Sequence, residues 1–266
     1  MFDKEWIEKA QKVTDAESWA HGAMLELDTS GGIYLNTLRM WYEEFPGSKK
    51  QKKPLRQRIE NFGNEDHLGG VNELSWWKFL QKGNFGAEPV PTASSARPDF
   101  KVQTPTEFFV EVSTLNVSAN EKQQMESEGA ISLNHAETLR RLLLKSTNDK
   151  HEQMSFACNQ RRPCCLVLFD YMTWSAFGTQ FFRYLASYLF RENGGFTQLP
   201  TELSALIYVE RKVIDGHIGL SRDRSAVYYN PNAKYPLAPG TFTELRQYWY
   251  QMVEVEPQCK DYWVWL

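Results

Sequence analysis

The chain has 266 residues and a formal net charge of −3, so no overall positive field favours nucleic acid, and any such binding must come from local basic patches. Hydrophobic residues make up 42% and aromatic residues 14% of the chain, which predicts a firmly folded protein and excludes a disordered one. No apolar run approaches the roughly 18 residues that span a bilayer, and the acidic N-terminus is no signal peptide.

The first ninety residues predict mainly helices. Apolar residues recur at helical spacing, and glycine and proline residues interrupt the pattern. In chain order, we expect a helix over residues 3–27, a helix over 35–45, the most basic run of the chain at 49–58, a helix over 71–80 and a short strand at 88–91.

A hairpin follows, with strands at residues 97–100 and 108–113. A tight loop centred on Pro105 places Asp99 directly opposite Glu111. Side chains paired in this way have Cβ atoms about 4.5–5.5 Å apart, and like charges repel there. A divalent cation between the two carboxylates would remove the repulsion, and oxygen ligands of this kind suit Mg²⁺ or Mn²⁺.

The second half of the chain predicts alternating helices and strands. We expect helices over residues 134–156 and 177–189, a strand at 164–170, strands at 206–209, 218–220 and 227–229, and a final segment, 242–266, that begins as a helix. The strand at 164–170 is apolar throughout, which indicates burial on both faces. The pattern predicts an α/β fold with a mixed central sheet flanked by helices.

The four cysteines indicate the cellular compartment. They include no C-x-x-C pair, which disfavours a zinc site. Cys164 and Cys165 are neighbours in an apolar strand, where they point to opposite faces and do not bridge. Reduced, buried thiols are typical of a cytosolic protein, so we expect a cytoplasmic location and no contact with a membrane.

The order of elements, together with Pro98-Asp99 and Glu111, resembles the PD-(D/E)XK nuclease superfamily of restriction, repair and phage-defence enzymes. The resemblance covers residues 65–175 and implies a restriction-endonuclease-like core. We therefore expect one domain over residues 1–266. Its parts are a helical N-terminal part at 1–64, a nuclease-like core at 65–195 and a C-terminal β-rich extension at 196–266.

The resemblance also implies a metal site. Asp99 matches the aspartate of the motif and Glu111 its second acid, so these two residues would bind Mg²⁺ or Mn²⁺ together with the Val112 carbonyl. An acid on the preceding helix often completes such a site, and Glu73 is the natural candidate, with Glu65 and Asp66 as alternatives. A metal held in this way activates water and neutralises charge on a phosphate.

The chain departs from the family at the third position of the motif, where Ser113 replaces the lysine. Some members of the superfamily supply this lysine from the following helix. There, Lys150 and Gln153 lie three residues apart and so on one helical face, and Lys145 is the less favoured substitute. The expected catalytic residues are thus Asp99, Glu111, Ser113, Lys150 and Gln153.

The basic run has two interpretations. Runs of this kind usually form a solvated loop or helix face, but they also contact DNA phosphates, which require positive charge and no sequence code. In the second interpretation the nucleic-acid-binding residues are Lys49, Lys50, Lys52, Lys53, Arg56 and Arg58.

Three functions remain open from the sequence. The first is a metal-dependent DNA endonuclease of bacterial defence or repair. The second, motivated by Ser113, is a catalytically inactive module of the same type that binds nucleic acid or a protein partner of a defence system. The third is a structural protein, for which Glu111 lies on a solvated face and the acidic pI is an ordinary property. Many such nucleases dimerise to cut both strands, but the sequence predicts no dimer surface.

Overall fold

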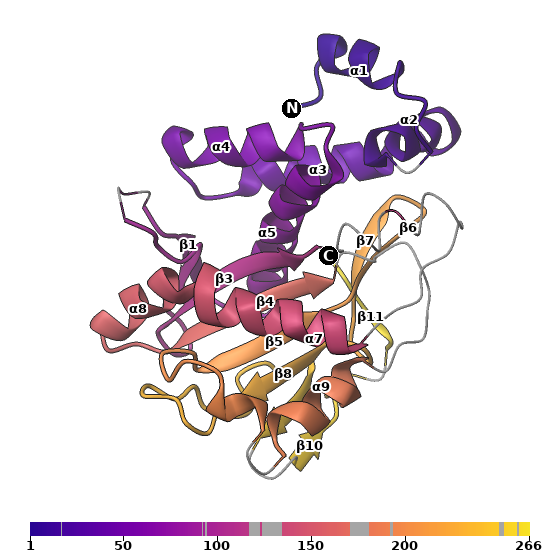
Figure 1. Cartoon of the computed structure of the whole chain (residues 1–266). Coiled ribbons are helices and arrows are strands. Elements are labelled where there is room, and N and C mark those ends of the chain that lie inside the picture. The colour runs from indigo at the N-terminus through magenta and orange to yellow at the C-terminus, as the bar shows by residue number, and fades with distance from the viewer. Residues whose placement is uncertain are drawn as a thin grey trace.

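The computed structural model describes residues 1–16, 18–91, 93, 95–116, 123, 135–170, 181–191, 194–249, 253–259 and 261–266. Within these residues the protein is a mixed α/β structure built around an eight-stranded sheet (Figure 1). This agrees with the α/β fold and the flanked central sheet expected from the sequence.

Helices form the N-terminal third of the chain and cover the sheet further along. They are α1 (Lys4–Ala10), α2 (Trp19–Ser30), α3 (Ile33–Glu44), α4 (Lys49–Ile59), α5 (Asn64–Lys82), α7 (His135–Leu144), the π-helical turn η1 (Lys145–Asp149), α8 (His151–Asn159), α9 (Phe181–Leu189) and the 3₁₀ turn η2 (Gly195–Thr197).

The strands form two sheets. In spatial order, the eight-stranded sheet contains β1 (Ala87–Pro89), β2 (Phe100–Val102), β3 (Phe108–Leu115), β4 (Cys164–Asp170), β5 (Ala205–Val209), β8 (Ala226–Tyr229), β9 (Arg246–Trp249) and β10 (Val253–Val255). The smaller sheet contains β11 (Trp263–Trp265), β7 (His217–Ser221) and β6 (Arg211–Ile214).

The central sheet is mixed in direction. Strands β1, β2 and β3 pair antiparallel, whereas β3, β4 and β5 pair parallel. Helices α7 and α8 make the crossover between the parallel strands β3 and β4, as a parallel connection requires. On the far side, β8 pairs antiparallel with β5 and parallel with β9, and β10 forms the edge.

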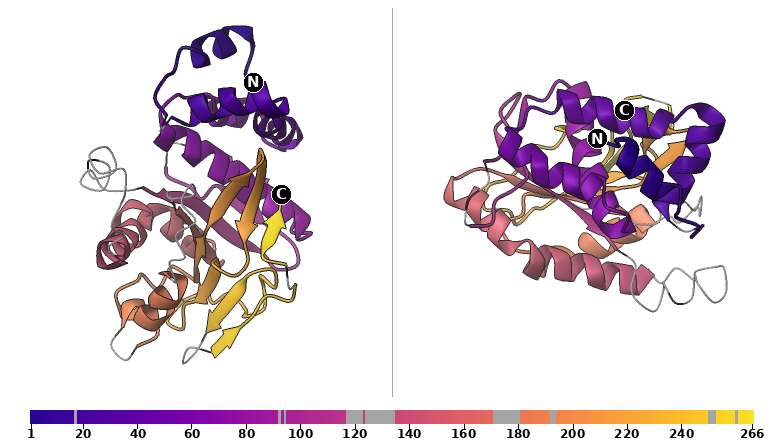
Figure 2. Two further views of the ribbon diagram at one scale, coloured as in Figure 1. Left: turned by 90° about the vertical axis from the view of Figure 1, so that its right-hand side faces the viewer. Right: turned by 90° about the horizontal axis from the view of Figure 1, so that it is seen from above.

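Alternate residues of the central strands pack into two separate hydrophobic cores, one on each face of the sheet. Phe108, Val110 and Val112 of β3 pack with α5 and the N-terminal helices on one face. Phe109 and Leu115 of the same strand pack with α7, α8 and α9 on the other face. Because side chains alternate along a strand, Glu111 and Ser113 share the face of the second core. The views from the side and from above show these layers (Figure 2).

The single helix expected over residues 3–27 is wrong, because the structure has two helices with separate N-caps. The Asp3 side chain accepts a hydrogen bond from the Trp6 N–H at the start of α1. Ser18 caps α2 in the same way. Polar N-cap residues satisfy backbone N–H groups that a helix leaves free, so each one starts a new helix.

The expected helix start after Gly69-Gly70 is also wrong, since both glycines lie inside α5. A Cβ atom on Gly70 would lie 2.8 Å from the Ile59 side chain of α4. The glycine therefore allows α4 and α5 to pack closely, and it does not break the helix.

The C-terminal segment departs from expectation in one of its elements. Residues 246–249 form strand β9 where a helix was expected, because they pair with β8 in the central sheet and tertiary pairing overrides local preference. Among the strands of the C-terminal part, β5, β8, β9 and β10 continue the central sheet, whereas β6, β7 and β11 form the smaller one. Residues 134, 177–180, 250–252 and 260 lie outside the described residues.

The strand expected at residues 97–100 is wrong in its bounds, since β2 covers Phe100–Val102 and shares only Phe100 with it. Other elements fit the structure more closely. The strand at 164–170 is β4, and the strands expected at 206–209, 218–220 and 227–229 are β5, β7 and β8. The helix expected over 134–156 is divided by the π turn into α7 and α8. Cys158, Cys164 and Cys165 are buried as expected, whereas Cys259 is partly exposed.

A buried histidine joins the N-terminal helices. His67 on α5 stacks on Trp19 and lies 2.8 Å from the Tyr34 hydroxyl and 2.7 Å from the Ile59 carbonyl. Because Nδ1 faces a carbonyl, we assign the proton to Nδ1, and Nε2 then accepts from the tyrosine. Burial lowers the pKa of His67 to about 3, while the Ile59 carbonyl opposes that change and Arg211 adds to it.

This histidine should make the protein less stable at acidic pH. The unfolded chain binds a proton near pH 6.5 and the folded chain does not, so the free energy of unfolding should fall by about 2 kcal/mol between pH 7 and pH 5 from this group alone. Urea unfolding of the wild type and His67→Gln at both pH values isolates the effect, because the other titrating groups are shared. An equal pH dependence in the two proteins would contradict the assignment.

Candidate functional site

The hairpin brings Asp99 to Glu111 as the sequence predicts. Strand β2 pairs with β3 in the register Phe100↔Val110, so Asp99, one residue before β2, lies opposite Glu111. The Asp99 Oδ2 atom accepts a hydrogen bond from the Val112 N–H at 2.7 Å. Just before β2 begins, the Asp99 side chain thus binds a backbone N–H of β3, and this contact fixes its carboxylate beside that strand.

Glu111 is a buried acid in the middle of β3, and only 3% of its surface is exposed. Its Oε1 atom lies 2.6 Å from the Nζ atom of Lys150, which begins α8. Its Oε2 atom is buried and has no hydrogen-bond partner among the described residues. The interpretation of Glu111 as an acid on a solvated face is thus wrong, because it lies between the sheet and the α8 helix.

Burial raises the pKa values of both acids, and neighbouring carboxylates add to the rise. Burial raises the pKa of Asp99 well above its ordinary value, and the charges of Glu111 and Glu73 raise it further. Burial also raises the pKa of Glu111, although the Lys150 ammonium group opposes this change. Two carboxyl groups with raised pKa values in one site hold their negative charge at a cost in free energy, and a cation between them would lower that cost.

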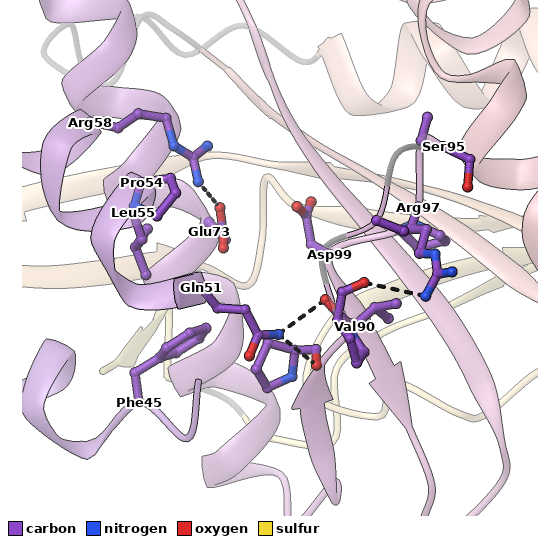
Figure 3. Close-up of a pocket in the computed structure, with 15 residues that line it drawn as sticks. Phe45, Gln51, Pro54, Leu55, Arg58, Glu73, Val90, Ser95, Arg97 and Asp99 are labelled. Atoms are coloured by element: carbon purple, nitrogen blue, oxygen red, sulfur yellow. Dashed lines mark hydrogen bonds and ion pairs between the residues drawn. The ribbon is translucent and has the colours of Figure 1, made fainter. Parts of the chain in front are cut away.

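Glu73 approaches the pair from α5 but carries its own partner. It forms an ion pair with Arg58 of α4. Burial lowers the pKa of Arg58, but the Glu73 carboxylate outweighs this and raises it above its ordinary value. Figure 3 shows this ion pair facing Asp99 across a pocket. The pocket has a volume of about 330 Å³, and Arg97 lines it together with these three residues.

The other two expected catalytic residues lie on the same side as Glu111. Ser113 shares the face of Glu111 and is the only residue of β3 that is not fully buried. Gln153 lies in the first turn of α8, three residues after Lys150, and its Oε1 atom is buried without a hydrogen-bond partner among the described residues. The expectation that Lys150 and Gln153 share a helical face fits these positions.

The basic run forms helix α4, and its six cations divide into two groups. Lys52 donates to the carbonyls of Tyr42 and Glu43 at the end of α3, and Arg56 pairs with Glu60 and Asp3. Those two and Arg58 are therefore used in contacts within the protein. The exposed members of the run, which have no ion-pair partner in the described part of the chain, are Lys49, Lys50 and Lys53.

The donor set fits a divalent cation with oxygen ligands at the edge of β3. The Val112 N–H points toward Asp99, and the N–H and C=O of one strand residue point to the same side, so the Val112 carbonyl shares this edge. The Asp99 carboxylate, the buried Oε2 of Glu111 and this carbonyl are hard oxygen donors of the kind that Mg²⁺ binds. No group of three or more acidic, histidine or cysteine side chains is arranged as a metal site within the described ranges. Glu73, the nearby third acid, forms its ion pair with Arg58.

Sequence reasoning did not assign a role to Arg97. Its guanidinium lies 5.1 Å from the centre of the Phe156 ring on α8, and its Nε is buried without a partner among the described residues. In Figure 3 it borders the pocket on the side of Asp99 away from Arg58. The sequence feature that could have identified Arg97 as a pocket residue is its position two residues before Asp99, in the segment Arg97-Pro98-Asp99.

Comparison with protein-family models finds no match, and searches of curated proteins and of solved structures give no significant match to this chain. Within the described residues, the helices are too short or too polar to cross a membrane.

Proposed function

We propose that the protein is a divalent-metal-dependent phosphodiester hydrolase of the PD-(D/E)XK type, a DNA endonuclease of bacterial defence or repair that acts in the cytoplasm. The observation that carries the proposal is the contact between Lys150 and Glu111 opposite Asp99. The motif lacks its lysine at position 113, and the ion pair puts a lysine from the following helix at the motif acid instead.

Each residue of the site has a role that follows from its position. Asp99, Glu111 and the Val112 carbonyl would hold Mg²⁺ or Mn²⁺, which when bound polarises a phosphate and lowers the pKa of a water ligand. Lys150, held by Glu111, would orient the attacking water. Gln153 and Ser113 offer hydrogen bonds on the same face. Glu73, which pairs with Arg58, would be a further ligand of the metal.

The basic helix α4 supports nucleic acid as the substrate. It begins at a capping box formed by Ser48 and Gln51 and carries the exposed Lys49, Lys50 and Lys53 in its first half. Its other end carries Arg58 into the pocket beside Asp99. One helix thus connects a positively charged surface with the acid pair, as binding of a phosphate backbone next to a cleavage site requires.

The test is a cleavage assay on plasmid, linear and single-stranded DNA with Mg²⁺ or Mn²⁺. We expect cleavage that stops when the metal is removed by EDTA and returns when it is added. Substitution of Arg183, which lies on α9, gives a control in which cleavage is kept.

The inactive module is the second candidate, and Ser113 together with the Arg58–Glu73 ion pair favours it. It would be supported by a folded wild-type protein that binds DNA or a protein partner but cuts no substrate with either metal. That outcome would reject the hydrolase.

A further inference from the structure

The helical crossover above Glu111 contains a π turn. The Lys150 N–H donates to the Lys145 carbonyl at 3.2 Å, five residues back, and closes the turn Lys145–Asp149. Residues five apart in an ordinary α-helix lie about 140° apart around the axis. The π hydrogen bond instead places Lys145 and Lys150 one above the other on a single face, and π turns of this kind are frequent at functional sites.

The direction of the helix then places Lys145 along β3. The crossover returns the chain from the end of β3 to the start of the parallel strand β4, so the helix runs opposite to β3. Both α7 and α8 contact β3, and Figure 1 shows them across one face of the sheet. Lys145 therefore lies one turn, about 5 Å, from Lys150 toward the carboxyl end of β3.

That displacement matches the spacing of the strand beneath. Residues two apart in a strand lie about 6.7 Å apart on the same face. Since Lys150 contacts Glu111, the two spacings together would set Lys145 over Ser113. Ser113 has a short side chain and is the one residue of β3 that is only partly buried. From this position the Lys145 ammonium group would serve in place of a lysine at position 113.

The charges around Lys145 agree with this placement. Burial lowers the pKa of Lys145, and the neighbouring Lys150 ammonium group lowers it further, while Asp149, Glu65 and Glu111 oppose the change. Lys145 is half-buried, and within the described residues it has no ion-pair partner, whereas Lys150 is held by Glu111.

We propose that Lys145 is a substrate-contacting residue whose ammonium group, above Ser113, binds a non-bridging oxygen of the phosphate at the Asp99–Glu111 pair. This inference rests on the proposed function. It assigns two roles of the missing motif lysine to two residues: Lys150 forms the ion pair with Glu111, and Lys145 binds the phosphate.

The experiment compares Lys145→Gln, Lys145→Arg and the double variant Ser113→Lys/Lys145→Gln with the wild type. Two properties are measured, the DNA cleavage rate and the affinity for inorganic phosphate in the presence of Mg²⁺. We expect Lys145→Gln to lower the cleavage rate about 100-fold and the phosphate affinity about tenfold. Arginine should keep part of both, and a lysine at position 113 should restore both. Lys12→Gln, at an exposed turn residue that follows α1, is the control.

The outcomes separate this inference from the proposed function. Phosphate binding that depends on Lys145 without any DNA cleavage supports the anion site and rejects the nuclease. Cleavage and phosphate binding that are the same in Lys145→Gln as in the wild type overturn the inference and keep the nuclease. A wild type that binds no phosphate, or a variant that changes only thermal stability, also overturns it.

Discussion

Replacing Lys150 with methionine should destabilise the protein by about 3 kcal/mol and lower the cleavage rate about 100-fold or more. The Lys150 ammonium group lies 2.6 Å from Glu111, which is 3% exposed. Removal of one partner of a buried pair leaves the other charge without compensation, and this costs more than the pair itself contributes. The free energy of unfolding is measured by urea denaturation at pH 7.

The pH dependence of this loss gives a second measure of the same contact. Burial raises the pKa of Glu111, and without Lys150 nothing nearby opposes that rise as strongly. The cost of the buried carboxylate is present above its folded pKa and is relieved as the pH falls and Glu111 takes up a proton. The difference in unfolding free energy between the wild type and Lys150→Met should therefore become smaller toward acidic pH.

A double variant provides the matched control. Glu111→Gln in the Lys150→Met background removes both charges and should recover most of the stability without recovering cleavage. Lys12→Met, which changes an exposed lysine, should alter stability by less than about 0.5 kcal/mol. A single Lys150→Met variant as stable as the wild type would show that the ion pair is absent in solution.

Replacing Asp99 with asparagine should abolish cleavage while making the protein more stable by about 1 kcal/mol at pH 7. Burial, with the charges of Glu111 and Glu73, raises the pKa of Asp99 well above its ordinary value. The cost in unfolding free energy is largest above that folded pKa, shrinks as the pH falls below it, and is gone only below the ordinary pKa of an aspartate in the unfolded chain. Asparagine keeps an oxygen for the Val112 N–H but carries no charge.

Metal binding distinguishes this prediction from a simple gain in stability. A ligand present at 100 times its dissociation constant stabilises the folded state by about 2.7 kcal/mol. Mg²⁺ should therefore raise the melting temperature of the wild type and leave that of Asp99→Asn unchanged. An Asp99→Asn protein that still cuts DNA, or that gains as much from Mg²⁺ as the wild type, would contradict a role for Asp99 in metal binding.

The parts of the fold and site that sequence reasoning predicted depend on local pattern. The loop around Pro105 fixed the register that puts Asp99 opposite Glu111, because a tight loop determines hairpin pairing. The apolar run Cys164–Asp170 identified β4 with its bounds. Helical spacing was also sufficient to place Lys150 and Gln153 on one face of the helix after the hairpin.

The parts that sequence reasoning missed depend on contacts between distant segments. Arg58 was assigned to nucleic acid and Glu73 to a metal, but they bind each other across α4 and α5, fifteen residues apart. Residues 246–249 pair with β8 in the central sheet, and the conformational preferences of these residues alone do not predict that pairing. The π turn that aligns Lys145 with Lys150 likewise has no marker in the local residue pattern.

The attachment of α4 to the core has a consequence for how the protein could be divided. Gln51 donates to the carbonyls of Pro89 and Val90 beside β1, and Arg58 binds Glu73. The N-terminal helices thus form one wall of the pocket at Asp99 and are no detachable module. A shortened chain that starts at residue 65 would leave Glu73 without its counter-charge and the acid pair open on one side, so loss of activity in such a truncation would not separate binding from catalysis.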